Sequence, residues 1–319
     1  MVWSEISKYI LYSPWTSFET KKEMSRRNTT FTDAIEEQIA IMQQAGKLRT
    51  AQIYRTALNN FMRFREGEDL PLLALDRRLV MAYESWMRSR GLQRNSSSFY
   101  LRSLRSAWHK ALDGRTVSPD PFDIVYTGVD KTAKRAVQLP DIKRLKALPL
   151  TGDEAWARDM FLFSFYTRGM SFVDMAFLRK SDLRGGLLDY SRRKTGQHLF
   201  IRWEPCMQEI LDRWPANPTQ YLLPIINRTD LPYYNQYKYG IAKANRNLHL
   251  IGYRLRLPAR LTMYVARHSW ASIAHSRHVP LSVISEGLGH DSERTTAIYL
   301  ASLDQQQIDA ANRSIIRLL

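Results

Sequence analysis

The sequence predicts a mainly α-helical protein with one small β-sheet, divided into two domains. Apolar residues recur at intervals of three and four along most of the 319 residues, which places them on one face of successive helices. One segment, between Leu187 and Trp203, instead carries short strand-like runs on both sides of Thr195-Gly196, as in a hairpin. A stretch of turn-forming and basic residues near the middle of the chain separates two helical regions.

The bulk composition is that of a globular and strongly basic protein. Apolar residues make up 44% of the chain, and its length of 319 residues suits two packed cores better than one. Lysine and arginine total 47 against 31 aspartate and glutamate residues, which gives a net charge of +16. Such a surface attracts polyanions, most commonly nucleic acid, although a ribosome-binding or membrane-surface protein would carry similar charge.

Cysteine usage and the N-terminus bear on the cellular location. Cys206 is the single cysteine, so neither an internal disulfide nor a thiolate metal cage is expected. The chain does not begin with the charged and apolar regions of a signal peptide, and no segment approaches the ~18 apolar residues of a membrane span. We therefore expect a cytoplasmic protein with no membrane partner.

Four consecutive helices are expected between residues 29 and 113. Thr32, Asp76 and Asn95 are suited to begin the first, third and fourth helix, and Gly91 to end the third. Each helix has an apolar face, formed in turn by Ala34, Ile35, Ile39 and Met42; Tyr54, Leu58, Phe61 and Phe64; Leu79, Tyr83, Trp86 and Met87; and Phe99, Leu101, Leu104 and Trp108. These faces predict a compact four-helix bundle within a domain over residues 29–125.

Basic residues on and after this bundle are candidate phosphate contacts. The second and fourth helices contain few acidic residues to pair with their arginines, which favours DNA contact over a merely solvated face. The candidates are Arg55, Arg94, Arg102 and Arg105 on the bundle, and Lys131, Lys134 and Arg135 in a linker over residues 126–138. Residues 1–28 are expected to form a short helix or an arm on DNA, or else a frayed tail.

The second domain, residues 139–319, is expected to be helical apart from the hairpin. Periodic apolar positions predict helices over residues 153–168, 171–180, 204–214, 233–246, 263–277, 281–287, 293–300 and 304–317.

Three motifs of this domain carry groups suited to phosphate chemistry. They are Arg192-Arg193-Lys194-Thr195-Gly196, Ala266-Arg267-His268-Ser269-Trp270, and Leu288-Gly289-His290 with Tyr299 nine residues later. Phosphodiester cleavage adds negative charge to the non-bridging oxygens, and a site without a metal must neutralise it with fixed cations and hydrogen-bond donors. Arg267 offers a planar fork for two phosphate oxygens, His290 is a further donor, and Tyr299 is a nucleophile able to form a phosphotyrosine.

Each of these residues also has a structural alternative. Arg267 would form an ion pair, His290 would end a helix, Tyr299 would pack in the core, and Lys194 would be ordinary hairpin surface.

In this order and at these separations, behind an N-terminal helical bundle, the motifs resemble the tyrosine recombinase (phage integrase) family over roughly residues 29–319. The resemblance implies a SAM-like core-binding domain followed by an α+β catalytic domain. It implies site-specific recombination of double-stranded DNA (integration, excision, inversion or resolution) through a 3′-phosphotyrosyl intermediate, with no cofactor and no metal. Lys194 matches the family lysine that protonates the leaving 5′ oxygen.

The same resemblance implies partners and a location. A tetramer on two DNA sites is expected, with accessory DNA-bending proteins as candidate partners. The protein is expected to associate with the nucleoid in the cytoplasm and to be of a bacterial, phage or mobile-element type. The C-terminal helix is expected to have an apolar face, which docks on a neighbouring subunit or packs on its own domain. This face consists of Ile308, Ala311, Ile315 and Leu318 or Leu319.

Two positions depart from the family pattern. Where the family carries its first catalytic arginine, three residues before Asp174, this chain has Ser171. Arg168 is the preferred substitute, since it would lie one turn earlier if the segment is helical, and Arg192 is the other, since it would share a strand face with Lys194.

The second departure lies three residues before Arg267. There Tyr264 replaces the usual histidine or lysine, and a phenol with a pKa of ~10 is a poor base near neutrality. His268 or water would then accept the proton of Tyr299, unless His268 only braces its helix. These departures leave open an alternative function, a catalytically impaired recombinase-like protein that binds DNA without cutting it.

Overall fold

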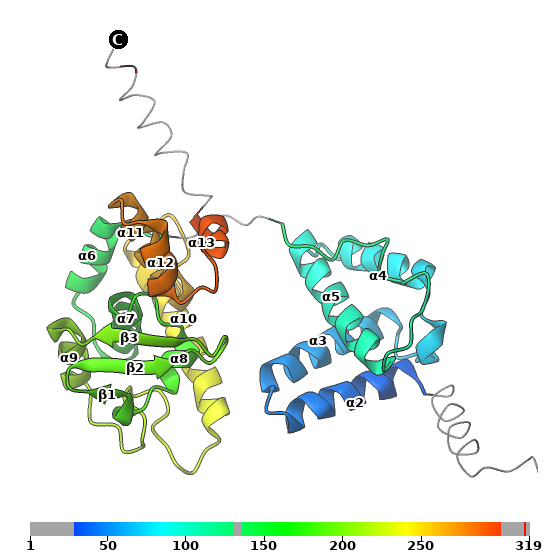
Figure 1. Cartoon of the computed structure of the whole chain (residues 1–319), viewed down its shortest axis with the longest axis horizontal. Coiled ribbons are helices and arrows are strands. Elements are labelled where there is room, and N and C mark those ends of the chain that lie inside the picture. Colours follow the sequence, from blue (N-terminus) through cyan, green and yellow to red (C-terminus); the bar gives the residue numbers. More distant parts are fainter. Residues whose placement is uncertain (1–28, 131–135, 301–315, 317–319) are drawn as a thin grey trace, which may run out of the picture. The chain divides into compact units, whose positions relative to one another are not determined.

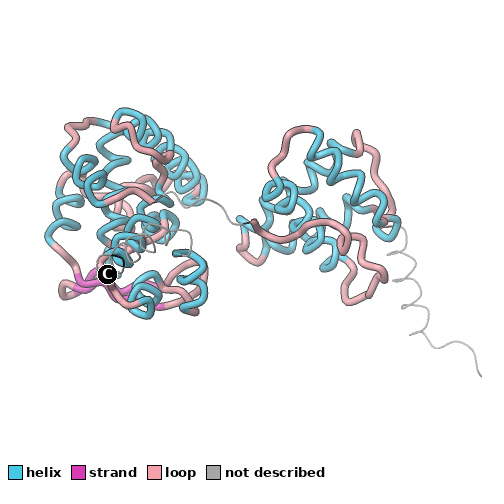
Figure 2. Tube along the Cα trace, turned by 90° about the horizontal axis from the view of Figure 1, so that it is seen from above, coloured by secondary structure: helices cyan, strands magenta, loops and turns pink. Residues whose placement is uncertain are grey.

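The computed structural model describes residues 29–130, 136–300 and 316. Contacts along the chain divide it into two compact units, Met1–Thr132 and Ala133–Leu319. Helices dominate both, and the strands that the structure describes lie in the second unit (Figures 1 and 2). The expected arm, the linker cations Lys131, Lys134 and Arg135, and the C-terminal helix apart from Ile316 lie outside the described residues.

The predicted four-helix bundle is confirmed within residues 29–130. It consists of α2 (Phe31–Gln44), α3 (Leu48–Phe64), α4 (Arg77–Ser89) and α5 (Arg94–Ala111), with a short 3₁₀ turn at Leu72–Ala74. Buried aromatic rings pack between the helices. The ring centroid of Phe61 lies 5.0 Å from that of Phe31 and 5.1 Å from that of Tyr83, which it meets edge to face. The buried indole of Trp108 donates to the Leu72 carbonyl at 3.1 Å, so its polar atom is satisfied inside the core.

The helix boundaries correct two of the expected caps. Asp76 caps α4 as predicted, accepting from the Leu79 amide at 2.8 Å. The prediction of Thr32 as the first cap is wrong, because Thr30 accepts from the Asp33 amide and Phe31, wholly buried, already begins the helix. The prediction that Asn95 begins α5 is also wrong. Its side chain instead bonds both backbone groups of Asp130, which lies 35 residues further along the chain.

The second unit packs its helices around α7 and α10. Its described helices are α6 (Leu139–Ala147), α7 (Gly152–Tyr166), α8 (Phe172–Ala176), α9 (Pro205–Asp212), α10 (Tyr233–Arg254), α11 (Met263–Ser276), α12 (Leu281–Leu288) and α13 (Glu293–Leu300). The prediction of a helix over 171–180 is too long, since α8 ends at Ala176 and a 3₁₀ turn, Lys180–Asp182, follows. In contrast, α10 extends eight residues past the expected 246, because Leu248 and Ile251 continue its buried face.

A three-stranded antiparallel sheet lies against these helices, in the order β1 (Leu183–Arg184), β2 (Leu187–Ser191), β3 (His198–Arg202) (Figure 1). The predicted hairpin is confirmed as β2 and β3, while the two-residue β1 was not expected. Alternate residues face the core, namely Leu188, Tyr190, Leu199 and Ile201. The six-residue turn between the strands therefore projects from a sheet whose position is fixed by one buried face.

None of the described helices combines the length and the apolar character that crossing a membrane requires.

Candidate active site

One pocket of the second unit gathers most of the residues that the motifs predict. It measures about 570 Å³ and lies among the loop after α7, the hairpin turn, α11 and the segment that joins α12 to α13. Among the described residues, its charged lining consists of Arg192, Lys194 and Arg267 against the single carboxylate of Asp291. His290 and Tyr264 line it as well. The excess of positive charge suits an anionic group such as a phosphate.

Two backbone carbonyls hold the guanidinium of Arg267 in place. It is 8% exposed on α11, and its Nη1 donates to the Gly169 carbonyl at 3.0 Å while Nη2 donates to the Leu288 carbonyl. Gly169 has φ +77°, and a Cβ built there would lie 2.6 Å from Cα of Arg267. The loop can pass so close to the arginine only because this residue has no side chain.

Gly169→Ala is expected to destabilise the protein by roughly 2–4 kcal/mol, because it adds an overpacked contact to an unfavourable backbone conformation. The matched control is Gly152→Ala, since Gly152 also has positive φ but has open space around its Cβ position. The free energy of unfolding of each variant in urea would measure the difference. Equal losses for the two variants would mean that the contact with Arg267 contributes nothing.

Arg192 enters the pocket from the end of the hairpin. β2 ends at Ser191, so Arg192 and Lys194 belong to the turn, and the expectation that they share a strand face is wrong. Arg192 is 8% exposed and its Nη1 donates to the Gly289 carbonyl, whereas Lys194 is exposed. Nε of Arg192 is buried with no hydrogen-bond partner among the described residues. Such an unpaired N–H is costly, and Oε1 of Gln197 in the same turn is likewise buried without a partner among the described residues.

His290 is positioned by the end of α12. Gly289 has φ +63°, its amide bonds the Glu286 carbonyl at 2.8 Å, and the His290 amide bonds the Ser285 carbonyl at 3.0 Å, which is a Schellman motif. Burial, and then the guanidinium groups of Arg267 and Arg192, lower the pKa of His290 from 6.5 to about 4. The imidazole is therefore neutral near pH 7.

Arg168 was the preferred substitute for the first catalytic arginine of the family, and Arg192 was the other. The helical segment assumed for Arg168 is wrong, because α7 ends at Tyr166 and Arg168 has φ +58°. Arg168 does not line the pocket; its Cδ lies beside Gly287 of α12. Ser171 does line the pocket, but its hydroxyl caps α8 and donates to the Asp174 carboxylate at 2.6 Å. Of the two arginines, only Arg192 lines this pocket.

Tyr264 and His268 take different positions on α11. Tyr264 is 62% exposed and lines the pocket, while His268 is buried and does not line it. Their rings meet edge to face at 4.4 Å. This contact agrees with His268 bracing its helix. Tyr299 belongs to α13, one residue before the helix ends, and the placement of its side chain lies outside what the structure describes.

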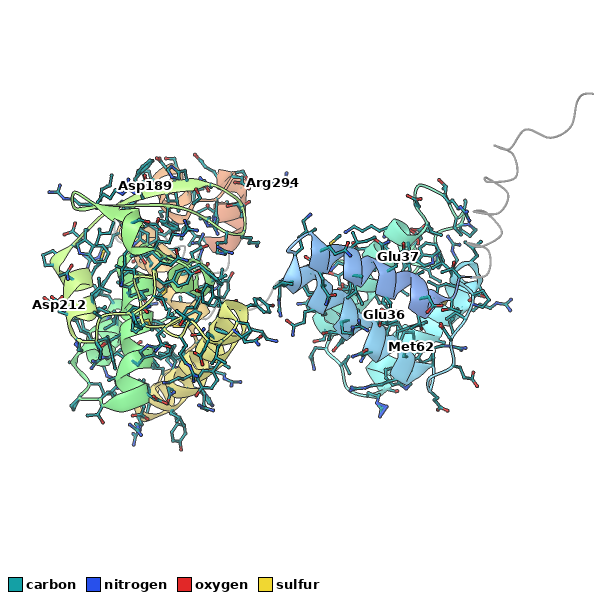
Figure 3. All side chains as sticks on the ribbon, turned by 90° about the horizontal axis from the view of Figure 1, so that it is seen from below. Glu36, Glu37, Met62, Asp189, Asp212 and Arg294 are labelled. Atoms are coloured by element: carbon teal, nitrogen blue, oxygen red, sulfur yellow. The ribbon has the colours of Figure 1, made fainter. Side chains whose placement is uncertain are left out.

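Three of the four arginines proposed to contact DNA on the first unit have acidic partners that the helix sequences do not reveal. Arg55 pairs with Glu36 of α2, which Figure 3 labels, and Arg94 lies 3.6 Å from Asp130. Arg105 pairs with Asp120 at 2.7 Å and Asp123 at 3.2 Å. Arg102 donates to the Gly128 carbonyl at 3.4 Å. Helices α3 and α5 themselves contain no acidic residue, as the sequence indicates, and the acidic partners come from other segments.

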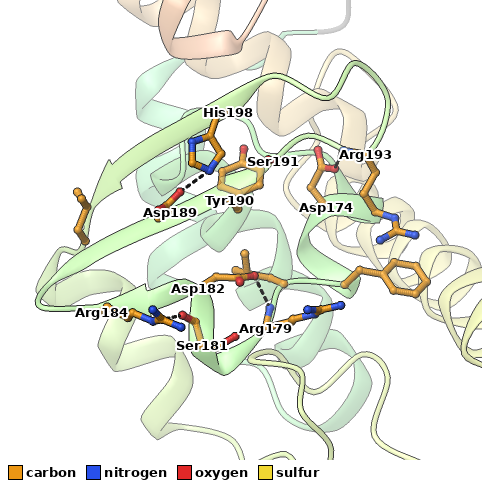
Figure 4. Close-up of a pocket in the computed structure, with 13 residues that line it drawn as sticks. Asp174, Arg179, Ser181, Asp182, Arg184, Asp189, Tyr190, Ser191, Arg193 and His198 are labelled. Atoms are coloured by element: carbon orange, nitrogen blue, oxygen red, sulfur yellow. Dashed lines mark hydrogen bonds and ion pairs between the residues drawn. The ribbon is translucent and has the colours of Figure 1, made fainter.

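A second pocket, of about 640 Å³, adjoins the hairpin but has a balanced lining (Figure 4). Asp189 pairs with His198 at 2.7 Å, and Asp174 accepts from the Arg193 amide at 2.9 Å. The charged residues that line it are Arg179, Arg184 and Arg193 against Asp174, Asp182 and Asp189. This pocket therefore lacks the positive excess of the first. No group of three or more histidine, cysteine or carboxylate side chains that suits a metal forms in the described part of the chain.

Comparisons with known proteins agree with the fold. The family described as phage integrase SAM-like domain matches residues 30–129. Tyrosine recombinase XerD of Shewanella oneidensis is 24% identical over 261 residues, which are 78% of this chain and 85% of that protein.

Two solved structures share the fold. XerH site-specific recombinase, bound to a palindromic difH substrate in a post-cleavage complex, aligns with a TM-score of 0.64 and 16% identity over 96% of this chain and 90% of that one. A lambda integrase tetramer bound to a Holliday junction aligns with a TM-score of 0.61 and 15% identity over 90% of this chain and 81% of that one.

Proposed function

The chain belongs to the tyrosine recombinase (phage integrase) family, and on this premise we propose that it cuts and rejoins double-stranded DNA at specific sites through Tyr299. The observation that carries the proposal is the convergence of Arg192, Lys194, Arg267 and His290 on one pocket. These groups supply the cations and donors that a phosphodiester requires when its charge increases during cleavage.

The proposed reaction exchanges one phosphodiester for another. The Tyr299 oxygen attacks phosphorus and passes its proton to water, and the bond from phosphorus to the 5′ oxygen breaks. Lys194, exposed at the hairpin turn, protonates the departing 5′ oxygen. The DNA then ends in a 3′-phosphotyrosine and a free 5′ hydroxyl. A 5′ hydroxyl from a second strand reverses these steps, so no energy source is needed.

The other groups of the pocket would bind the phosphate. Arg267 faces it with a guanidinium already oriented by two carbonyls, and His290 donates one hydrogen bond. We assign Arg192 to the place of the missing family arginine, because its guanidinium-bearing side chain lines the pocket. Tyr264 stands at the pocket edge, where its hydroxyl would bind DNA or the attacking group.

Arg192→Ala is expected to lower the rate of DNA cleavage by about 10²–10³-fold, because it removes a positive donor from the phosphate. Arg168→Ala, the control, should leave the rate close to that of the wild type, since this residue lies beside α12 outside the pocket. Single-turnover cleavage of a bound duplex measures both. A large loss with Arg168→Ala and none with Arg192→Ala would reverse the assignment.

Both units would contact DNA. We propose that residues 29–125 form the core-binding domain, 126–138 the linker and 139–319 the catalytic domain. Arg55, Arg94, Arg102 and Arg105 would exchange their present partners for phosphates. The ion pairs of Arg55 and Arg94 are exposed and contribute only ~0–1 kcal/mol, so the exchange costs little at these two positions. Lys131, Lys134 and Arg135 are proposed to contact the backbone between the domains.

Assembly follows from what strand exchange requires. Two sites cut on both strands need four nucleophiles, and we propose a tetramer on two DNA sites; the lambda integrase neighbour is a tetramer on a Holliday junction. The C-terminal helix would dock on a neighbouring subunit or on its own domain. Accessory DNA-bending proteins remain candidate partners, and a DNA substrate places the protein at the nucleoid in the bacterial cytoplasm.

One observation favours the alternative of a DNA-binding protein that does not cut. The position of the first family arginine holds Ser171, whose hydroxyl is already bonded to Asp174. If Arg192 does not compensate, the phosphate would be bound but not cleaved.

A nicked substrate separates the two functions. A duplex is first enriched from a random-sequence library by binding to the wild-type protein, and we call it the selected duplex. A nick next to the cut position lets the 5′ fragment diffuse away, so that cleavage traps the protein on DNA. The proposed function expects a covalent adduct on the peptide that contains Tyr299. The binding-only alternative would be established if the protein bound the selected duplex tightly and formed no adduct, wherever in the duplex the nick was placed.

A further inference from the structure

The hydroxyl of Thr296 lies 2.8 Å from Nδ1 of His290. Thr296 is on α13, is wholly buried, and lies one helical turn before Tyr299. We propose that Thr296 is a positioning residue that fixes the tautomer of His290, so that the imidazole presents Nε2–H to the phosphate. The proposal rests on the function given above and concerns how one of its groups is prepared.

The count of hydrogens decides which atom donates. A threonine hydroxyl has one hydrogen, and a neutral imidazole has one N–H and one acceptor nitrogen. The structure gives the Thr296 hydroxyl no other hydrogen-bond acceptor among the described residues. If Nδ1–H donated to the hydroxyl, the buried O–H hydrogen would have no acceptor, at a cost of about 1–3 kcal/mol. Donation from Thr296 to Nδ1 gives both the hydroxyl hydrogen and Nδ1 a partner.

Burial and the charges around the ring keep it neutral, as this bond requires. Burial is the main cause that lowers the pKa of His290; the charges of Arg267, Arg192 and Lys194 lower it further, while Asp291 opposes them. A protonated imidazole would carry hydrogen on Nδ1 and lose the bond from Thr296. With Nδ1 accepting, the remaining hydrogen is on Nε2. His290 therefore acts as a donor to a phosphate oxygen and does not take the proton of Tyr299.

The same bond fixes the nucleophile helix. The backbone of His290 is set by the Schellman motif of α12, and its ring is set by Thr296 of α13. Leu288, two residues earlier, accepts from Arg267. The Thr296 hydroxyl thus links the phosphate-binding groups to α13 by a hydrogen bond, in addition to the apolar packing of Leu300 in one cluster with Leu288. Thr296 is absent from the motifs, and only its spacing from His290 and Tyr299 would have indicated it.

Thr296→Val tests the proposal, since it keeps the shape and the β-branch but removes the hydroxyl. Thr296→Ser is the matched variant that keeps the donor. With ¹⁵N-labelled histidine, the wild type and Thr296→Ser should show His290 as the Nε2–H tautomer, identified by its loss in His290→Asn. Thr296→Val should show a mixture of tautomers. Single-turnover cleavage of the selected duplex should fall about tenfold in Thr296→Val and recover in Thr296→Ser, with DNA affinity unchanged.

Two results would overturn the inference: a wild-type His290 found as the Nδ1–H tautomer, or a Thr296→Val variant with wild-type tautomer and cleavage. If Thr296→Val does not fold, the tautomer of His290 in the wild type and in Thr296→Ser still tests the inference. Failure of the proposed function gives a different pattern. In that case the wild type forms no adduct on any nicked duplex, while the tautomer measurement, which needs no DNA, still supports or rejects the role of Thr296.

Discussion

A Tyr299→Phe variant is expected to bind the selected duplex with wild-type affinity and to form no covalent adduct, a loss of at least ~10⁴-fold. The variant lacks the oxygen that attacks phosphorus but keeps the aromatic ring. Gel electrophoresis of labelled nicked duplex under denaturing conditions measures the adduct, and filter binding measures affinity.

Tyr253→Phe is the control for this prediction, because Tyr253 is 83% exposed on α10 and does not line the pocket. It should form the adduct at the wild-type rate. An adduct that persists in Tyr299→Phe would contradict the assignment of the nucleophile. If that adduct mapped to Tyr264, the attack would have to come from the tyrosine at the pocket edge.

Arg267→Lys is expected to lower the cleavage rate by about 10³-fold while the protein stays folded. The guanidinium reaches the Gly169 and Leu288 carbonyls with two different nitrogens. A lysine has a single nitrogen, which cannot bond both carbonyls and a phosphate in a fixed plane. Single-turnover cleavage gives the rate, and urea unfolding shows how much stability is lost.

Arg144→Lys provides the matched control in the same unit. Arg144 also donates to a backbone carbonyl, that of Leu255 at 2.8 Å, but it lies on α6 outside the pocket. Its replacement should leave cleavage unchanged. A cleavage rate for Arg267→Lys equal to that of Arg144→Lys would show that the fork geometry has no role in the reaction.

Local sequence predicted the elements well where a local rule determines them. The four bundle helices follow from apolar side chains spaced by three and four, and Asp76 caps α4 because its carboxylate needs only an amide three residues away. The hairpin follows from two short runs around Thr195-Gly196. The motif residues Arg267 and His290, 23 residues apart, do meet in one pocket, as the resemblance to the family implied.

Errors arose where a distant segment decides the outcome. Asn95 looks like a helix cap, but Asp130 takes its side chain. Arg55 and Arg105 look unpaired along their helices, but Glu36 and Asp120 reach them from elsewhere. Arg168 was preferred over Arg192 on the assumption of a continuous helix, and a left-handed turn at Arg168 and Gly169 breaks it.

The sequence alone therefore determined the fold class, the family and the chemical groups available for phosphate transfer. These depend on periodicity and on residue types at set spacings, which fold into the same local structures in most surroundings. The tertiary structure alone decided that Arg192 enters the pocket and Arg168 does not, and that Thr296 bonds His290. Such choices depend on burial and on hydrogen bonds between segments up to 97 residues apart, as between Arg192 and Gly289, which no local pattern encodes.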